Sequence, residues 1–269
     1  MLLNFREYGE RIGEPLLILH GLFGSLDNWH AVARRLAEGW WTVTVDLRNH
    51  GGSPHSTDFT YPLLAGDVAE LFDRLGAQRA SVLGHSMGGK TAMELALSRP
   101  ERVSRLIVVD IAPKRYPPHY EDLRDAMFSV DLTAIGSRRE AEASLARRIS
   151  DQTLRLFLLK NLRRDDMGRF RWQLDLPSIA ANFDEIWAAI DGERTYQGPA
   201  LFLRGSRSDY VSDEDLASIR RLFPRGRLAT IEGAGHWVHA EQPEALIGAV
   251  ESFLRQDLTS DGQTAHPSS

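Results

Sequence analysis

Gly84-His85-Ser86-Met87-Gly88-Gly89 is the most informative part of this 269-residue chain. An apolar run over residues 80–83 leads into it, and a helical pattern over residues 90–98 follows it. A G-x-S-x-G sequence between a strand and a helix is typical of a sharp turn that exposes the serine hydroxyl above a sheet. Glycines on both sides suit that turn because it leaves no room for a Cβ atom. The stretch therefore predicts a reactive serine at Ser86.

Short apolar runs alternate with helical patterns on both sides of this turn. The runs that we expect to form strands are residues 15–20, 40–47, 80–83, 103–110, 199–203 and 228–231. The helical patterns cover residues 28–37, 61–75, 90–98, 212–223 and 241–255. Such alternation predicts an α/β fold in which a mostly parallel sheet carries helices on both faces. Ligands bind beyond the carboxyl ends of the strands in such sheets, so we expect the site there.

The alternation stops between residues 112 and 197, where prolines and further helical patterns occur. The sequence from Ser137 to Glu140 is typical of a capping box and predicts a helix to residue 149. Two more helices are expected over 151–162 and 178–190, with a short strand over 170–174. We interpret residues 112–197 as a mostly helical cap inserted into an α/β core of residues 1–111 and 198–257. The polar residues 258–269 predict a flexible tail.

A serine hydroxyl needs an adjacent base to attack at neutral pH, and histidine suits that role. His236 is the best candidate among the nine histidines, because it follows the last expected strand in a glycine-rich loop. An acid must then orient the imidazole. Asp110 follows four apolar residues at a strand end, where a buried aspartate is costly unless it is paired. Asp110 is therefore favoured, and Asp209, which follows the next core strand, stays the alternative.

The stretch His20-Gly21-Leu22-Phe23-Gly24 follows the first buried strand and predicts part of an oxyanion hole. We expect the backbone N–H groups of Leu22 and Met87 to stabilise the negative oxygen that forms during acyl transfer. Phe23 is the alternative to Leu22. The side chains that we expect around the substrate flank these motifs or come from the cap, and they are Phe23, His85, Tyr210, Trp237, Phe128, Leu158, Trp172 and Trp187.

Longer motifs resemble the α/β-hydrolase superfamily, and more narrowly the YbfF-type esterases, over nearly the whole chain. These motifs are HGLFGSLDN (20–28), DLRNHG (46–51), GHSMGGK (84–90), DIAP (110–113), YVS (210–212) and GAGHWVHAE (233–241). Most superfamily members carry the acid three residues after the glycine of the later strand, where this chain has Ser208. In the YbfF-type subgroup the acid matches Asp110 and a serine matches Ser208. The resemblance thus implies Asp110 as the acid and Ser208 as an auxiliary residue, while the extra carboxylate of Asp209 departs from the pattern.

The resemblance implies a serine carboxylic-ester hydrolase that forms an acyl-enzyme on small esters with short- to medium-chain acyl groups. The same residues would also suit thioester, carbon–carbon, amide or perhydrolase substrates. Epoxide hydrolases and haloalkane dehalogenases are disfavoured, because they resemble this fold but have aspartate at the position of Ser86. The non-enzyme alternative is a small-molecule binding protein on the same fold.

Composition narrows the partners. The net charge of −5, with 26% charged residues, gives no electrostatic basis for binding nucleic acid or an anionic membrane. The absence of cysteine excludes disulfides, a thiolate nucleophile and a cysteine-ligated metal. We expect no cofactor, no metal and a small-molecule ester as the partner, with the oligomeric state left open. A cytoplasmic location is expected because no apolar targeting segment or membrane-spanning run occurs in the sequence.

Overall fold

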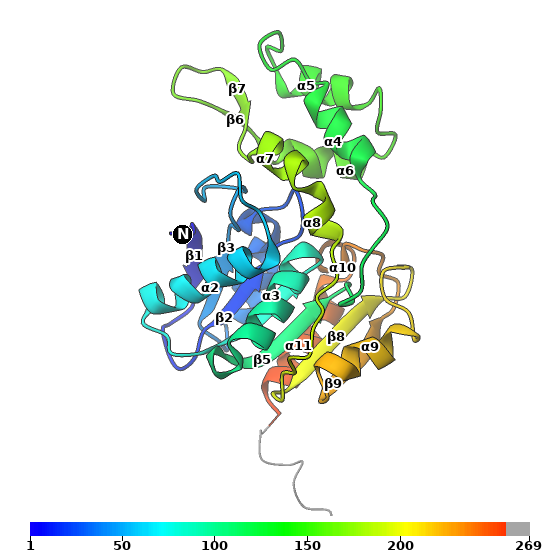
Figure 1. Ribbon diagram of the computed structural model, residues 1–269. Helices are drawn as coiled ribbons and strands as arrows, with labels where there is room; N and C mark the ends of the chain where they lie inside the picture. Colours follow the sequence, from blue (N-terminus) through cyan, green and yellow to red (C-terminus); the bar gives the residue numbers. More distant parts are fainter. Residues whose placement is uncertain (257–269) are drawn as a thin grey trace, which may run out of the picture.

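A seven-stranded sheet forms the centre of the computed structural model, which describes residues 1–256 (Figure 1). The strand order is β1-β3-β2-β4-β5-β8-β9. Their bounds are β1 Phe5–Tyr8, β2 Leu16–Leu19, β3 Thr42–Val45, β4 Ala80–His85, β5 Val103–Val109, β8 Ala200–Gly205 and β9 Gly226–Ile231. Every neighbouring pair is parallel except β1 and β3. The predicted α/β fold with a mostly parallel sheet is therefore confirmed.

Helices cover both faces of this sheet, as the alternation predicted. On one face, buried residues of α2 (Tyr61–Leu75), α3 (Met87–Ser98) and α9 (Asp215–Leu222) pack in a cluster with Leu17 and Leu19. On the other face, residues of α1 (His30–Leu36), α10 (Val238–Glu241) and α11 (Pro243–Leu254) pack with Leu16 and Ile18. Successive strand side chains point to opposite faces, so a strand that is apolar at every position serves both clusters.

Strand β1 is not among the strands predicted from the sequence. It pairs antiparallel with β3, from Phe5 opposite Val45 to Tyr8 opposite Thr42. Its sequence, Phe-Arg-Glu-Tyr, is only partly buried because it forms an edge of the sheet. A half-exposed edge strand lacks the continuous apolar run that identified the buried strands.

The segment between β5 and β8 forms a separate group of elements, which Figure 1 shows together at the top of the view. We call residues 112–197 the inserted segment. Its elements are α4 Glu121–Phe128, α5 Arg138–Leu145, α6 Gln152–Leu159, β6 Leu162–Arg164, β7 Phe170–Trp172, α7 Leu176–Ala181 and α8 Phe183–Trp187.

The capping residue predicted for α5 is found, since the Ser137 side chain accepts a hydrogen bond from the Glu140 N–H. Three of the expected helices end differently. The helix expected to run to residue 149 ends at Leu145. The helix expected over 151–162 ends at Leu159, and residues 162–164 instead pair with β7 in a hairpin. The helix expected over 178–190 is two short helices separated by Asn182. The division into core and cap stays a prediction, and residues 257–269, with the expected tail, lie outside the described residues.

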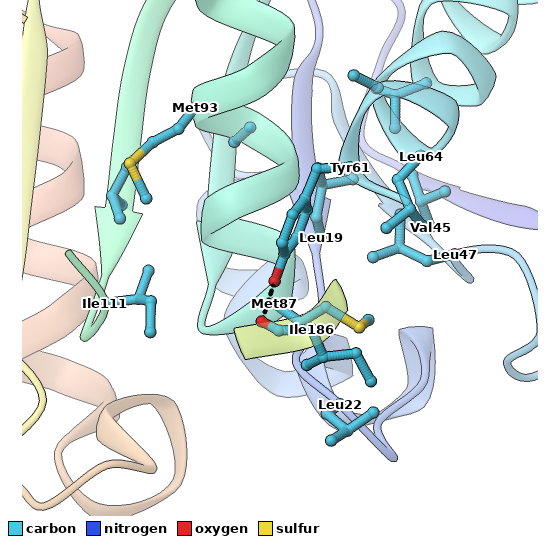
Figure 2. Packing of buried hydrophobic residues seen from close by; sticks show 14 of the residues in the cluster. Leu19, Leu22, Val45, Leu47, Tyr61, Leu64, Met87, Met93, Ile111 and Ile186 are labelled. Atoms are coloured by element: carbon cyan, nitrogen blue, oxygen red, sulfur yellow. Dashed lines mark hydrogen bonds between the residues drawn. The ribbon is translucent and has the colours of Figure 1, made fainter. Parts of the chain in front are cut away.

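Two stretches of chain connect the inserted segment to the rest of the protein. They are hydrogen-bonded to each other and to the helices that cover the sheet. The Tyr116 N–H donates to the Trp187 carbonyl (3.0 Å). From α2, the Tyr61 hydroxyl donates to the Ile186 carbonyl (2.7 Å; Figure 2). From α3, the buried Lys90 ammonium donates to the Ala188 carbonyl (2.5 Å), and burial lowers its pKa to about 7. Carbonyls at a helix end attract such a donor, so the end of α8 is held against the core.

The close packing of the turn after β4 predicts a large effect of one methyl group. A Cβ added at Gly84 would lie 2.1 Å from the Gly88 carbonyl oxygen, which is backbone and cannot move aside freely. We expect Gly84→Ala to lower the free energy of unfolding by about 1–3 kcal/mol. The control is Gly248→Ala in α11, where a Cβ meets nothing within 4 Å. It should raise stability by about 0.5–1 kcal/mol, and equal effects of both variants in urea unfolding would contradict the packing argument.

Candidate active site

Ser86 occupies the turn between β4 and α3 in a conformation that few residues other than glycine adopt. Its φ is 53° and its ψ is −119°. The turn packs closely against the neighbouring strand, because a Cβ at Gly88 would lie 2.5 Å from the carbonyl oxygen of Leu19. Strain of this kind is found at functional sites, where the surrounding structure maintains it. Ser86 also caps α3, so the helix N-terminus and its partial positive charge lie next to the hydroxyl.

Asp110 follows β5 and bonds to three groups from later parts of the chain. It is fully buried, with a φ of 53°. One carboxylate oxygen accepts from the Gly205 N–H (3.0 Å). The other accepts from the Ser208 hydroxyl (2.5 Å) and from Nδ1 of His236 (2.8 Å). Because the ionised carboxylate can only accept, Nδ1 of His236 carries the proton and Nε2 is left as a base.

The structure distinguishes the two aspartates that the sequence left open. Asp209 is exposed, whereas Asp110 is buried and hydrogen-bonded to His236. Tyr210, next in the chain, lies flat on the His236 ring, with centroids 3.8 Å apart and planes at 17°. The imidazole is therefore held at its edge by a carboxylate and on one face by an aromatic ring.

Ser86 and His236 line the same cavity. It measures about 20 Å³, which is room for about one water molecule. A larger cavity of about 580 Å³ lies outside it, between α6 and the loop that carries His236. The residues that line both cavities are Asn28, Leu154, Phe157, Trp237 and His239. The two cavities are therefore adjacent and share these side chains.

The two N–H groups expected to form an oxyanion hole belong to segments that meet at Ser86. Leu22 lines the cavity, and Met87 is the first residue of α3, whose N–H has no partner within the helix. Within residues 1–256, no hydrogen bond of the structure uses either N–H. The N–H of Phe23, the alternative donor, is already bonded to Nε2 of His50 (3.3 Å).

Some of the expected substrate contacts lie at the cavity. Phe23, His85 and Trp237 line it, whereas Tyr210 is not a lining residue and contacts His236 instead. His85 lies beneath His236 and donates from Nε2 to its carbonyl oxygen (2.8 Å). The side chain of Met87 packs in the buried cluster of Figure 2.

The four residues expected from the inserted segment do not line this cavity. Phe128 is 51% exposed on the surface, and Leu158 is buried in the core of the segment. The Trp172 indole N–H donates to the Met127 carbonyl (3.2 Å), and Trp187 is buried against His119. None of these four side chains lines the cavity at Ser86, so their contact with a substrate stays a prediction.

Other residues of the inserted segment line the cavity in their place. These are Tyr120, Leu123, Leu154 and Phe157. Leu154 and Phe157 are three positions apart on α6, and residues with that spacing share one face of a helix. The sequence shows this apolar face, but it does not show which face of α6 turns toward Ser86.

Within residues 1–256, no group of three or more His, Asp or Glu side chains is arranged to hold a metal ion. Every helix in that range is too short or too polar to cross a membrane. The expected cytoplasmic location and the expected lack of a cofactor stay predictions.

Comparison with known proteins identifies the family of this chain. The family model described as the alpha/beta hydrolase fold matches residues 14–243. The chain belongs to the α/β-hydrolase family. A solved structure of a marine microorganism esterase superposes with a TM-score of 0.91 at 42% sequence identity, over 94% of this chain and 99% of that one.

Two curated relatives of this α/β hydrolase cover most of its length. The sn-1-specific diacylglycerol lipase ABHD11 of Mus musculus is 41% identical over 254 residues, which is 91% of this chain and 82% of that protein. Esterase YbfF of Escherichia coli (strain K12) is 34% identical over 243 residues, which is 89% of this chain and 92% of that protein. The resemblance to YbfF-type esterases is therefore confirmed.

Burial favours the neutral form of four histidines near the site, because it lowers their pKa values. Burial lowers the pKa of His20 to about 4, and the pKa values of His50 and His239 to about 3. It also lowers the pKa of His85 well below its usual value. In the unfolded chain these groups titrate near 6.5. The unfolded state therefore binds protons below pH 6.5 that the folded state does not bind.

This difference predicts the pH dependence of stability. Stability is fully present above about pH 6.5 and is lost as the pH falls toward the folded pKa values. Each of these histidines contributes a slope of up to about 1.4 kcal/mol per pH unit. Urea unfolding between pH 7.5 and 5 should show a slope larger than one histidine can produce. His55→Gln, which removes an exposed ring, should keep that slope, and a flat profile in both proteins would contradict the neutral state.

Proposed function

We propose that this α/β hydrolase is a serine carboxylesterase that cleaves small esters through an acyl-enzyme. The observation that carries the proposal is the bond from Nδ1 of His236 to buried Asp110, together with the one cavity that His236 and Ser86 both line. A hydroxyl becomes a nucleophile at neutral pH when a base takes its proton. Esterase and lipase names among the relatives support an ester as the substrate.

In the proposed reaction, Ser86 Oγ attacks the ester carbonyl while Nε2 of His236 takes its proton. The imidazolium that forms is stabilised by the Asp110 carboxylate and by the face of Tyr210. The N–H groups of Leu22 and Met87 stabilise the developing oxyanion. His236 then protonates the leaving alcohol, and the same base activates a water that releases the acid.

Two further features fit this proposal. Ser208 donates to the same carboxylate oxygen as His236, so it holds Asp110 in place and acts as an auxiliary residue. The inserted segment supplies Leu154 and Phe157 to both cavities, as a cap over the substrate would. The narrow space at Ser86 suits a small group next to the carbonyl, and the outer cavity suits a short to medium acyl chain.

Loss of the nucleophile tests the reaction. Ser86→Ala should lower kcat for p-nitrophenyl butyrate by at least about 10⁴, because the remaining groups cannot form the acyl-enzyme. Ser98→Ala is the matched control, since that exposed hydroxyl lies at the other end of α3. A fluorophosphonate probe should label the parent protein and the control but not Ser86→Ala. Turnover retained in purified Ser86→Ala would refute the nucleophile.

Replacing each candidate aspartate by asparagine tests which of them orients His236. Asp110→Asn should lower kcat by about 10⁴, because the amide no longer fixes the His236 tautomer. Asp209→Asn should change kcat by less than about threefold, since that side chain is exposed. Both variants are compared at pH 7.5 with circular dichroism as a check of folding. The reverse order of effects would assign the acid to Asp209.

A further inference from the structure

Phe23 has the strained backbone of the segment that carries the Leu22 N–H. Its φ is 58°, in the left-handed region that a bulky side chain disfavours, and its ring is almost fully buried. Such a conformation persists only when its surroundings hold it. The groups that hold it have no role in the reaction proposed above, and they bond to the peptide groups from Gly21 to Gly24.

The first two peptide groups are held by buried histidines. The Gly21 carbonyl, which shares a peptide plane with the Leu22 N–H, accepts from Nδ1 of His20 (2.8 Å). The next peptide carries the Phe23 N–H, which donates to Nε2 of His50 (3.3 Å). Because Nε2 accepts this bond while Nδ1 donates to the Arg48 carbonyl (2.9 Å), the His50 ring is neutral. Both rings come from the core.

The third peptide group is held from the inserted segment. The Phe23 carbonyl accepts from Nδ2 of Asn161 (2.7 Å), and the Gly24 N–H of the same peptide donates back to the Gly21 carbonyl (3.0 Å). Asn161 lies between α6 and β6 and is 3% exposed. Its Nδ2 also donates to the Leu158 carbonyl (3.2 Å). Both neighbours are carbonyl oxygens, so only the amide donor of asparagine fits between them.

The backbone of Asn161 is itself fixed. Its N–H donates to the Leu158 carbonyl (3.0 Å), and its carbonyl accepts from the Gln173 N–H (2.8 Å), next to the β6–β7 hairpin. The side chain is therefore a rigid link between the inserted segment and the Phe23 carbonyl. Through the Gly24 N–H, that link continues to the peptide plane that directs the Leu22 N–H.

We propose that Asn161 is a positioning residue that completes the oxyanion hole from the inserted segment. This inference rests on the proposed function, because it takes the Leu22 N–H as an oxyanion donor. The core histidines set two of the peptide planes, and Asn161 sets the third. The oxyanion hole is then in its working geometry only while the inserted segment lies on the core, so the segment affects the rate of acyl transfer as well as substrate binding.

The test compares two asparagines of the inserted segment. Asn182 is the matched control, because its Nδ2 also donates to a core carbonyl, that of Thr57 (2.8 Å), away from the oxyanion segment. With p-nitrophenyl butyrate, Asn161→Ala should lower kcat by about 10- to 100-fold, less than the loss of a whole oxyanion donor, and leave KM within about threefold. Asn182→Ala should keep kcat within about threefold.

A transition-state analogue separates positioning from a general structural effect. The affinity for a trifluoromethyl ketone should fall in Asn161→Ala by the same factor as kcat/KM, because its adduct carries the oxyanion. Asn161→Asp replaces the amide donor by an oxygen at the same volume and should lose at least as much. Thermal unfolding of each variant checks folding. If Asn161→Ala fails to fold, the comparison of Asn161→Asp with Asn182→Asp decides in the same way.

The outcomes separate this inference from the proposed function. Ester cleavage that depends on Ser86 but is unchanged in the Asn161 variants overturns the positioning role alone. Equal losses in the Asn161 and Asn182 variants, or a rise in KM without a fall in kcat, overturn it as well. A parent protein that cleaves no ester, or a Ser86→Ala variant with full activity, overturns the proposed function and this inference together.

Discussion

Burial of the Asp110 carboxylate is the constraint on which the rest of the site depends. A charge without contact with water is costly unless hydrogen-bond donors surround it. Here the backbone N–H of the last residue of β8, the Ser208 hydroxyl and the His236 ring supply those donors. The same bonds fix the ring of His236 and join three loops at the carboxyl ends of β5, β8 and β9. The hydrogen bonds that stabilise the buried Asp110 carboxylate thus also position the groups around Ser86.

The sequence predicted most of the sheet because β2, β4, β5 and β8 contain continuous apolar runs. Three features could be predicted because they depend only on residues close together in the sequence. They are the continuous apolar runs, the glycines around Ser86 and the helix over 61–75. Strand β1 was missed because an edge strand has an exposed side. The helix predicted over 151–162 is too long because the leucine-rich pattern continues past Leu159, where the helix in fact ends and the chain continues into the hairpin.

The contents of the cavity were harder to predict than its reactive groups. Asp110 and His236 follow strands, and the ends of parallel strands meet at one edge, so strand order alone brings them near each other. The side chains of the inserted segment reach the cavity only through the packing of one helix on another. Trp172 and Trp187 have the size and polarity of substrate contacts, yet both pack inside the segment. Which face of α6 turns inward depends on contacts far away in the sequence.

The positions of the Asp110 partners in the sequence also affect when the chain can fold during its synthesis. Its carboxylate leaves the ribosome with β5, whereas Gly205 and His236 follow 95 and 126 residues later. Until they emerge, the end of β5 would have to bury an uncompensated charge. The amino-terminal half therefore cannot close around this residue during synthesis, and final compaction waits for the last strands. The group that organises the site also delays its completion in the nascent chain.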